Sequence, residues 1–251
     1  MGFESDTSKS KISSNTVKLG PDETVLDNPI WTSLRTIHEK LAVVEGETRR
    51  YPSAVGPLAG TPDQSIASYA TLRDLAGPTG ILALFFPDPP ALPPGWTLVR
   101  GGVLAQMICR RPELIGEETL TDEVVLRRLT MADVPAMIEL AELTEPGPFR
   151  DRTIELGNFY GVLEGKRLLS MSGQRMRVPG FVEVSAVCTH PDARGRGYAG
   201  ILMSRVIRDI GEEGATPFLH AFVENPAVRL YTKLGFVQRR TFELAVIRRD
   251  E

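Results

Sequence analysis

A short segment with two arginines and two glycines, Arg194-Gly195-Arg196-Gly197, offers the clearest chemistry in this 251-residue chain. Residues 182 to 189 before it are rich in small and β-branched apolar types and predict a buried strand, which His190-Pro191 ends. After it, apolar residues recur with helical spacing at Ala199, Leu202, Met203, Val206, Ile207 and Ile210. A glycine-bearing turn between a strand and a helix presents unpaired backbone N–H groups and the positive end of a helix dipole, which together bind phosphate oxygens. Because glycine spacing alone also fits an ordinary solvated turn, the predicted phosphate site needs a second signal.

Two motifs supply that signal. Arg194-x-x-Gly197-x-Ala199 resembles the pyrophosphate loop, Arg/Gln-x-x-Gly-x-Gly/Ala, of the GNAT superfamily of acyl-CoA N-acyltransferases. Further along, the segment Asn225-Pro-Ala-Val-Arg-Leu-Tyr231-Thr-Lys-Leu-Gly-Phe236 resembles the second signature of that superfamily. The resemblance covers residues 124 to 248. It implies an α/β (α+β) fold with a mixed, mostly antiparallel central sheet flanked by helices, and acetyl-CoA as co-substrate.

The resemblance also implies a set of contacts with CoA. The pyrophosphate would lie against Arg194, Gly195, Arg196, Gly197, Tyr198, Ala199 and Gly200, where a glycine at 197 lets the N–H groups approach the ligand. The extended pantetheine arm would pair, like an added strand, with Val187, Cys188 and Thr189. Two neighbouring strands of this superfamily splay apart at the acyl group, and the corresponding gap would lie between residues 182–189 and 218–223. Asn225 would lie at the far lip of that gap while also capping a helix.

Acyl transfer from CoA needs a group that takes the amine proton and an acid for the departing thiolate. Tyr231 shares a helical face with Ala227, Leu230 and Leu234, so its ring should point toward the sheet. The resemblance places this phenol beside the CoA sulfur, as the general acid. It also matches Glu183 to a position where many members keep a carboxylate that takes the amine proton, although a salt-bridged strand residue fits equally well. His220 could serve instead, but a packed neutral histidine is the favoured interpretation.

Cysteine and metal chemistry are disfavoured. Cys109 and Cys188 are the only cysteines, and both fall in strand-like apolar runs, so we expect buried, reduced thiols and neither a disulfide framework nor a metal site. Cys188 is a poor candidate for an acyl-accepting nucleophile because no motif places a base beside it. His190, held before a proline at a strand end, is interpreted as an exposed turn residue.

The amino-acid composition limits the classes of partner that we expect this protein to bind. Lys and Arg number 29 against 32 Asp and Glu, and the arginines are scattered rather than gathered in a basic face, which disfavours nucleic acid. No apolar run approaches the ~20 residues needed to span a bilayer, and the N-terminus lacks the apolar core of a signal peptide. We therefore expect a cytoplasmic protein with no membrane partner, and the sequence leaves open whether it is a monomer or a homodimer.

The N-terminal half predicts a small α/β domain over residues 21–112, after a disordered tail over residues 1–20. Its expected elements are a helix after Asn28-Pro29 with Trp31, Leu34, Ile37, His38 and Leu41 on one face, a helix over 65–75, and strands over 81–86 and 96–109 separated by a proline-rich loop. His38 is interpreted as a satisfied core histidine. This half is similar to the reduced first half of two-lobed acyltransferases such as the glycine N-acyltransferase type.

A polar linker over residues 113–122 leads to the predicted N-acetyltransferase domain over 123–251. A strand over 124–129 precedes Thr130 and Asp133, whose spacing indicates a capping box at the start of a helix. Further elements are expected as a hairpin over 159–163 and 168–177, strands over 182–189, 218–223 and 237–248, a helix after Gly197, and a helix over 226–234.

These features favour transfer of an acyl group, with acetyl preferred, from CoA to a primary amine by direct attack. The lack of a charged stripe favours a small-molecule acceptor. The alternative is a catalytically silent acyl-CoA-binding sensor. A P-loop nucleotide hydrolase is excluded because Gly197 is followed by Tyr-Ala and not by Gly-Lys-Ser/Thr.

Overall fold

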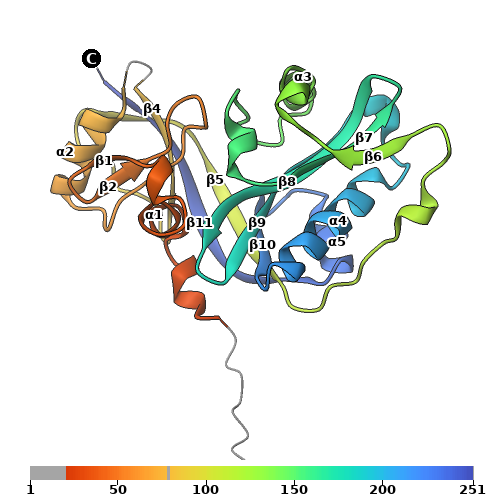
Figure 1. Ribbon diagram of the computed structural model, residues 1–251. Coiled ribbons are helices and arrows are strands. Elements are labelled where there is room, and N and C mark those ends of the chain that lie inside the picture. The colour runs from red at the N-terminus through yellow and green to blue at the C-terminus, as the bar shows by residue number, and fades with distance from the viewer. Residues whose placement is uncertain (1–20, 78–79, 251) are drawn as a thin grey trace, which may run out of the picture.

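One large sheet forms the centre of the molecule (Figure 1). The computed structural model describes residues 21–77 and 80–250, so the predicted tail over residues 1–20 lies outside the described residues. In spatial order the eight strands are β4 (Ile81–Phe86), β11 (Phe236–Arg249), β5 (Trp96–Cys109), β10 (Thr216–Phe222), β9 (Phe181–Thr189), β8 (Arg167–Val178), β7 (Phe159–Glu164) and β6 (Val125–Arg128). Every neighbouring pair is antiparallel except β9 with β10. The predicted fold class, a mixed and mostly antiparallel sheet with flanking helices, is confirmed.

Both halves of the chain contribute to this sheet. Strand β5 pairs with β11 along one edge and with β10 along the other, so a strand of the N-terminal half lies between two strands of the C-terminal half. Strand β4 extends the same sheet beyond β11. The division of the chain at residues 113–122 stays a prediction, and any such division has to account for strands that exchange backbone hydrogen bonds across it.

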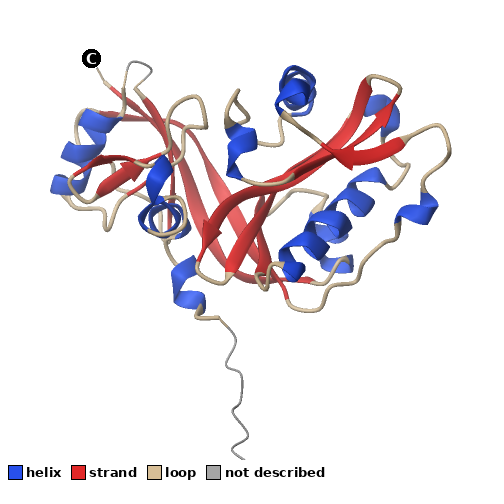
Figure 2. Cartoon of the chain, in the orientation of Figure 1, coloured by secondary structure: helices blue, strands red, loops and turns tan. Residues whose placement is uncertain are grey.

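Helices cover both faces of the sheet (Figure 2). The helices are α1 (Pro29–Arg35), α2 (Ile66–Leu75), α3 (Val134–Thr144), α4 (Tyr198–Glu212) and α5 (Val228–Lys233). Helices α3 and α4 lie on opposite faces of β8 and β9, each over its own cluster of buried apolar side chains. Short 3-10 turns occur at Glu23–Leu26, Glu39–Leu41, Glu117–Thr119, Met131–Asp133, Thr153–Leu156 and Pro191–Ala193. This arrangement leaves β9 held between two packed layers.

Local signals in the sequence placed most of these elements. Pro29 is the first residue of α1, and Thr130 and Asp133 form the expected capping box, with the Thr130 N–H donating to Asp133 Oδ2 over 2.8 Å. His38 is a satisfied core histidine as predicted, because it is buried and its Nδ1 lies 2.8 Å from the Tyr51 hydroxyl.

Two local expectations were wrong, and one feature was not predicted. Helix α1 ends at Arg35, so Ile37 is 56% exposed instead of lying on a buried face. Helix α5 begins at Val228 instead of 226, because the residues before it form a separate turn. A small sheet of β1 (Val43–Glu45), β2 (Thr48–Arg50) and β3 (Ala59–Gly60) was not expected at all.

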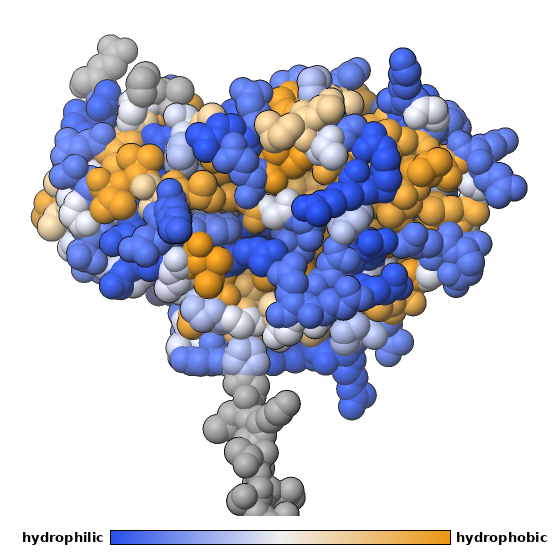
Figure 3. Space-filling model, viewed as in Figure 1, coloured by the Kyte–Doolittle hydropathy of each residue, from blue (hydrophilic) through white to orange (hydrophobic). Residues whose placement is uncertain are grey.

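The surface is mixed in polarity. Figure 3 shows hydrophilic side chains over the middle of one face, with hydrophobic patches over the small sheet and over β6 and β7. Val43 and Val44 of β1 and Val125 of β6 are among the exposed apolar residues. None of the helices in residues 21–77 and 80–250 is long and apolar enough to cross a membrane.

Candidate active site

Strands β9 and β10 open a wedge in the sheet. They pair only at their first residues, from Thr216 with Phe181 to Phe218 with Glu183. Beyond that point β9 continues to Thr189 and β10 to Phe222 without pairing between them in the described part of the chain. One edge of β9 therefore stays open over residues 184 to 189, and its backbone can pair with an extended ligand.

A β-bulge at Ala186 changes the direction of β9 at the mouth of this wedge. Two residues, Ala186 and Val187, stand opposite Ser172 alone, and Ala186 adopts a left-handed φ of 52°. The bulge reverses which face the side chains meet. Val182 and Val184 pack in the cluster that contains α4, whereas Ala186 and Cys188 pack in the cluster that contains α3. As a result, Val187 lines the cavity described next.

A cavity of about 220 Å³ occupies the wedge. Its walls include β9 residues 184–187 and β10 residues 219–222, together with Asn225 and Tyr231. Most of the Tyr231 ring is buried, with 6% of the residue exposed, and burial raises the pKa of its hydroxyl to about 12. No hydrogen-bond partner of that hydroxyl occurs among the described residues. Tyr231 thus lines the cavity with a ring whose hydroxyl is protonated and has no partner in the described part of the chain.

The turn after β9 forms a cradle of backbone donors. Gly195 and Gly197 have left-handed φ values of 78° and 80°, and a side chain at either position would meet no atom within 4 Å. Within the described chain, no acceptor is paired with the N–H groups of residues 195 to 199. Helix α4, 15 residues long, begins directly behind them at Tyr198. Unpaired donors, open space and a helix N-terminus together can bind phosphate oxygens, and the assignment of this turn to the CoA pyrophosphate stays a prediction.

Comparisons with known proteins agree with this geometry. The FR47-like protein family matches residues 159–244. A crystal structure from Novosphingobium aromaticivorans DSM 12444, assigned to the GNAT family of acetyltransferases, is 38% identical and superposes with a TM-score of 0.81, covering 90% of this chain and 99% of the other. The chain belongs to the GNAT family. A GCN5-related N-acetyltransferase from Kribbella flavida shares the fold at 15% identity, with a TM-score of 0.60 over 86% of this chain and 93% of the other. A search of curated proteins found no match.

Within this GNAT chain, Glu183 lies beneath the cavity and does not line it. It is fully buried and forms a two-pronged ion pair with Arg175, from Nε to Oε2 at 2.7 Å and from Nη2 to Oε1 at 2.8 Å. Burial opposes ionisation of Glu183, but the charge and hydrogen bonds of Arg175, with a further hydrogen bond from His220, lower its pKa to about 2. The base role of Glu183 stays a prediction, and this environment favours the salt-bridged alternative.

His220 is part of the same buried network. Its Nδ1 lies 2.8 Å from Glu183 Oε1, and its Nε2 lies 3.1 Å from Gln106 Nε2. Since the Gln106 amide nitrogen is a donor and Glu183 is an acceptor, the network fits a neutral ring that donates from Nδ1 and accepts at Nε2. Burial lowers the pKa of His220, which also favours the neutral ring. Both ring nitrogens are engaged, as in the packed neutral histidine that the sequence favoured.

Of the remaining predicted site residues, some present a side chain to the wedge and others can offer only their backbone. Cys188 is buried away from the wedge, and burial raises its thiol pKa to about 11, so only its backbone is placed to meet a ligand. Thr189 bonds through its hydroxyl to Ser170 at 2.8 Å. The side chain of Tyr198 is buried, which leaves its backbone N–H for the cradle. Asn225 accepts a hydrogen bond from the Ala227 N–H at 2.9 Å while lining the cavity, so it both stabilises the turn before α5 and faces the wedge.

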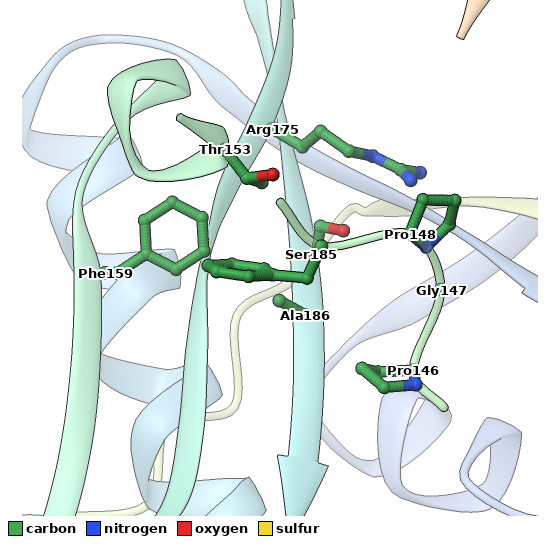
Figure 4. Close-up of a pocket in the computed structure, with 9 residues that line it drawn as sticks. Pro146, Gly147, Pro148, Thr153, Phe159, Arg175, Ser185 and Ala186 are labelled. Carbon is green, nitrogen blue, oxygen red and sulfur yellow. The ribbon is translucent and has the colours of Figure 1, made fainter. Parts of the chain in front are cut away.

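The sequence missed a large part of the cavity wall. Residues from outside the recognised motifs also line it, among them Leu58, Ala83, Phe85, Arg100, Leu244 and Val246. The segment Glu145–Pro148 closes another side, and Figure 4 shows Pro146, Gly147 and Pro148 beside Ser185 and Ala186 of β9, with Arg175 reaching toward Pro148. No periodicity or motif marks the lining residues outside this segment, because they meet only in the folded chain.

Proposed function

We propose that this protein is an N-acyltransferase that moves an acetyl group from acetyl-CoA to a primary amine of a small molecule. The observation that carries the proposal is that Tyr231 lines the cavity between the diverging strands and that its hydroxyl has no hydrogen-bond partner among the described residues. The open edge of β9 leads from that cavity to the N–H groups of residues 195 to 199. A thioester ligand bound along this path would place its sulfur near the phenol.

The residues support direct transfer. The free electron pair of a neutral amine attacks the thioester carbonyl carbon, the carbon–sulfur bond breaks, and the amine nitrogen loses a proton to solvent. Tyr231 donates its proton to the departing thiolate and regains one from water. Its pKa, raised to about 12, keeps the phenol protonated at neutral pH; because a thiol has a pKa of about 8.5, the phenol stabilises the thiolate chiefly by a hydrogen bond held in place, and the proton passes on as free CoA forms. Val187 and the unpaired β9 backbone hold the pantetheine arm in line with this exchange.

The first experiment incubates the purified protein with acetyl-CoA and a library of amines and measures the release of free thiol. We expect release with at least one small primary amine. Tight CoA binding with no release from any amine would instead assign the protein to the acyl-CoA-binding sensor class.

The second experiment tests Tyr231 directly. Tyr231→Phe keeps the ring and its packing against Phe236, whose ring centroid lies 6.4 Å away, and removes only the hydroxyl. General acid catalysis contributes about 10²- to 10⁴-fold, and we expect a fall in kcat near the lower end because a thiolate leaves readily. Affinity for acetyl-CoA and the melting temperature should change little. If this variant kept the wild-type kcat, and chemistry was shown to limit the rate, Tyr231 would be a core residue without a catalytic role.

A further inference from the structure

The far wall of the cavity carries an apolar surface. Leu244 of β11 pairs with Phe85 of β4, and Val246 pairs with Ala83, so these side chains stand next to each other on two neighbouring strands. Phe85, Leu244 and Val246 are each half-buried and line the cavity. A cavity of about 150 Å³ can already hold benzene. The cavity here, about 220 Å³, exceeds that volume and is shared between this apolar wall and the edge of β9.

Arg100 adds a positive charge to this wall. It is an exposed residue of β5, and its guanidinium lies over the Phe222 ring with 5.6 Å to the ring centroid. Gly102 makes room for that ring, since a side chain at 102 would approach Phe222 to 2.8 Å. Among the residues that the structure describes, no carboxylate is paired with Arg100. The other arginine in the lining, Arg175, already has its charge matched by Glu183.

Glu145 brings a negative charge to the opposite side. It follows the last residue of α3 with a left-handed φ of 48°, and its backbone N–H bonds to the Ala141 carbonyl at 2.8 Å. The carboxylate has no cationic partner in the described chain. The C-terminus of α3 is the negative end of the helix dipole, so the dipole and the Glu145 carboxylate together attract cations. The neighbouring residues Pro146 and Gly147 lie beside the bulge of β9, so this negative side adjoins the wedge.

We propose that the acceptor is an amphoteric small molecule, an amine that also carries an anionic group and an apolar body. This inference rests on the proposed function. Arg100 binds the anionic group, the surface of Phe85, Leu244 and Val246 holds the apolar body, and Glu145 attracts the ammonium toward the wedge. A carboxylate suits Arg100 because a guanidinium offers it two parallel donors.

The test compares matched pairs of probes in the presence of saturating CoA. The pairs are L-phenylalanine, L-leucine and L-methionine, each with its own amide, which lacks the anionic group. Calorimetry measures binding of each probe, and thiol release from acetyl-CoA measures turnover. We expect at least one amino acid to bind about 10- to 100-fold more tightly than its amide, which is the range for a charge-assisted hydrogen bond in place of a neutral one.

Two variants locate the charges. Arg100→Gln should abolish the preference for the amino acid over its amide. Arg240→Gln is the matched control, because Arg240 also lies over an aromatic ring, 4.9 Å from the centroid of Phe242, but does not line the cavity. Glu145→Gln should weaken binding of L-phenylalanine and leave binding of 3-phenylpropanoate, which has no ammonium, unchanged. Glu142→Gln, on the exposed side of the same helix, is its control.

The outcomes separate this inference from the proposed function. Amides that bind as well as amino acids in all three pairs would overturn the inference, and thiol release with those amides would still support acetyl transfer. A clear preference for amino acids without thiol release would support the amphoteric site and count against acetyl transfer. If Arg100→Gln weakened CoA binding and kept the amino-acid preference, Arg100 would belong to the co-substrate site and the inference would be wrong.

Discussion

The environment of Glu183 predicts that this carboxylate stabilises the fold and does not act as the catalytic base. The perturbation is Glu183→Gln, which keeps the shape of the side chain and removes its charge. Arg175, with only 14% of its side chain exposed, would then lie without its counter-ion. Removing one partner of a buried pair costs about 3–5 kcal/mol, because the remaining charge stays buried and unpaired.

The pKa of Glu183 gives a second measure of the same effect. It falls from 4.5 to about 2 on folding, and at ~1.4 kcal/mol for each pH unit this difference corresponds to about 3 kcal/mol. Because the folded-state pKa is the lower one, this stabilisation is fully present above about pH 4.5 and is lost as the pH falls toward 2. The wild-type protein should therefore exceed Glu183→Gln in unfolding free energy by about 3 kcal/mol at pH 7 and by roughly half as much at pH 3.

Urea unfolding at pH 7 and pH 3 measures both differences. Glu213→Gln is a suitable control, because it breaks the 2.7 Å contact with Arg177 between partly exposed side chains and should cost less than about 1 kcal/mol. The kcat of the folded Glu183→Gln protein, measured with an amine found by the thiol assay, should stay within a few-fold of wild type. A variant of unchanged stability whose kcat falls by about 10²-fold or more would refute this reasoning and make Glu183 the base.

Two further predictions concern glycines. Gly197→Asp should leave the fold intact and weaken CoA binding by at least ~100-fold in a calorimetric titration, because its carboxylate would face the phosphates. Gly214→Asp is the control, since Gly214 also has a left-handed φ and open space around it. If the two variants bound CoA with equal affinity, the assignment of residues 195 to 199 as the phosphate site would be wrong. Gly235→Ala should lower the unfolding free energy by more than ~2 kcal/mol, since its Cβ would lie 1.7 Å from the Arg111 carbonyl oxygen at a φ of 93°. Gly165→Ala has only the backbone strain and should cost about 1 kcal/mol, so equal losses in urea unfolding would contradict the clash.

Sequence reasoning located the parts of the site that are continuous in the chain. The strand, turn and helix over residues 181 to 212 and the Tyr231 helix each have local signals, namely apolar spacing, a glycine turn and a resemblance to known motifs. The bulge at Ala186 has no such signal, because its left-handed φ falls on an alanine where glycine would be the usual mark. The partners of Glu183 were also hidden, since its 2.7 Å contact with Arg175 depends on the register of β8 against β9.

The residues of the proposed acceptor side of the cavity could not be predicted from the sequence either, because only the fold brings them together. Phe85 and Arg100 come from consecutive strands, but Leu244 comes from β11, far along the chain, and the three meet only because β11 lies between β4 and β5 in the sheet. Strand β5 also pairs with β10, the strand whose divergence from β9 opens the wedge. Strand β5 of the N-terminal half thus holds β10, one side of the wedge, in place, and strands β4 and β5 contribute Phe85 and Arg100 to the cavity lining. Changes in strands β4 and β5 should consequently alter which acceptor binds, while CoA binding follows the β9 edge and the turn over residues 195 to 199.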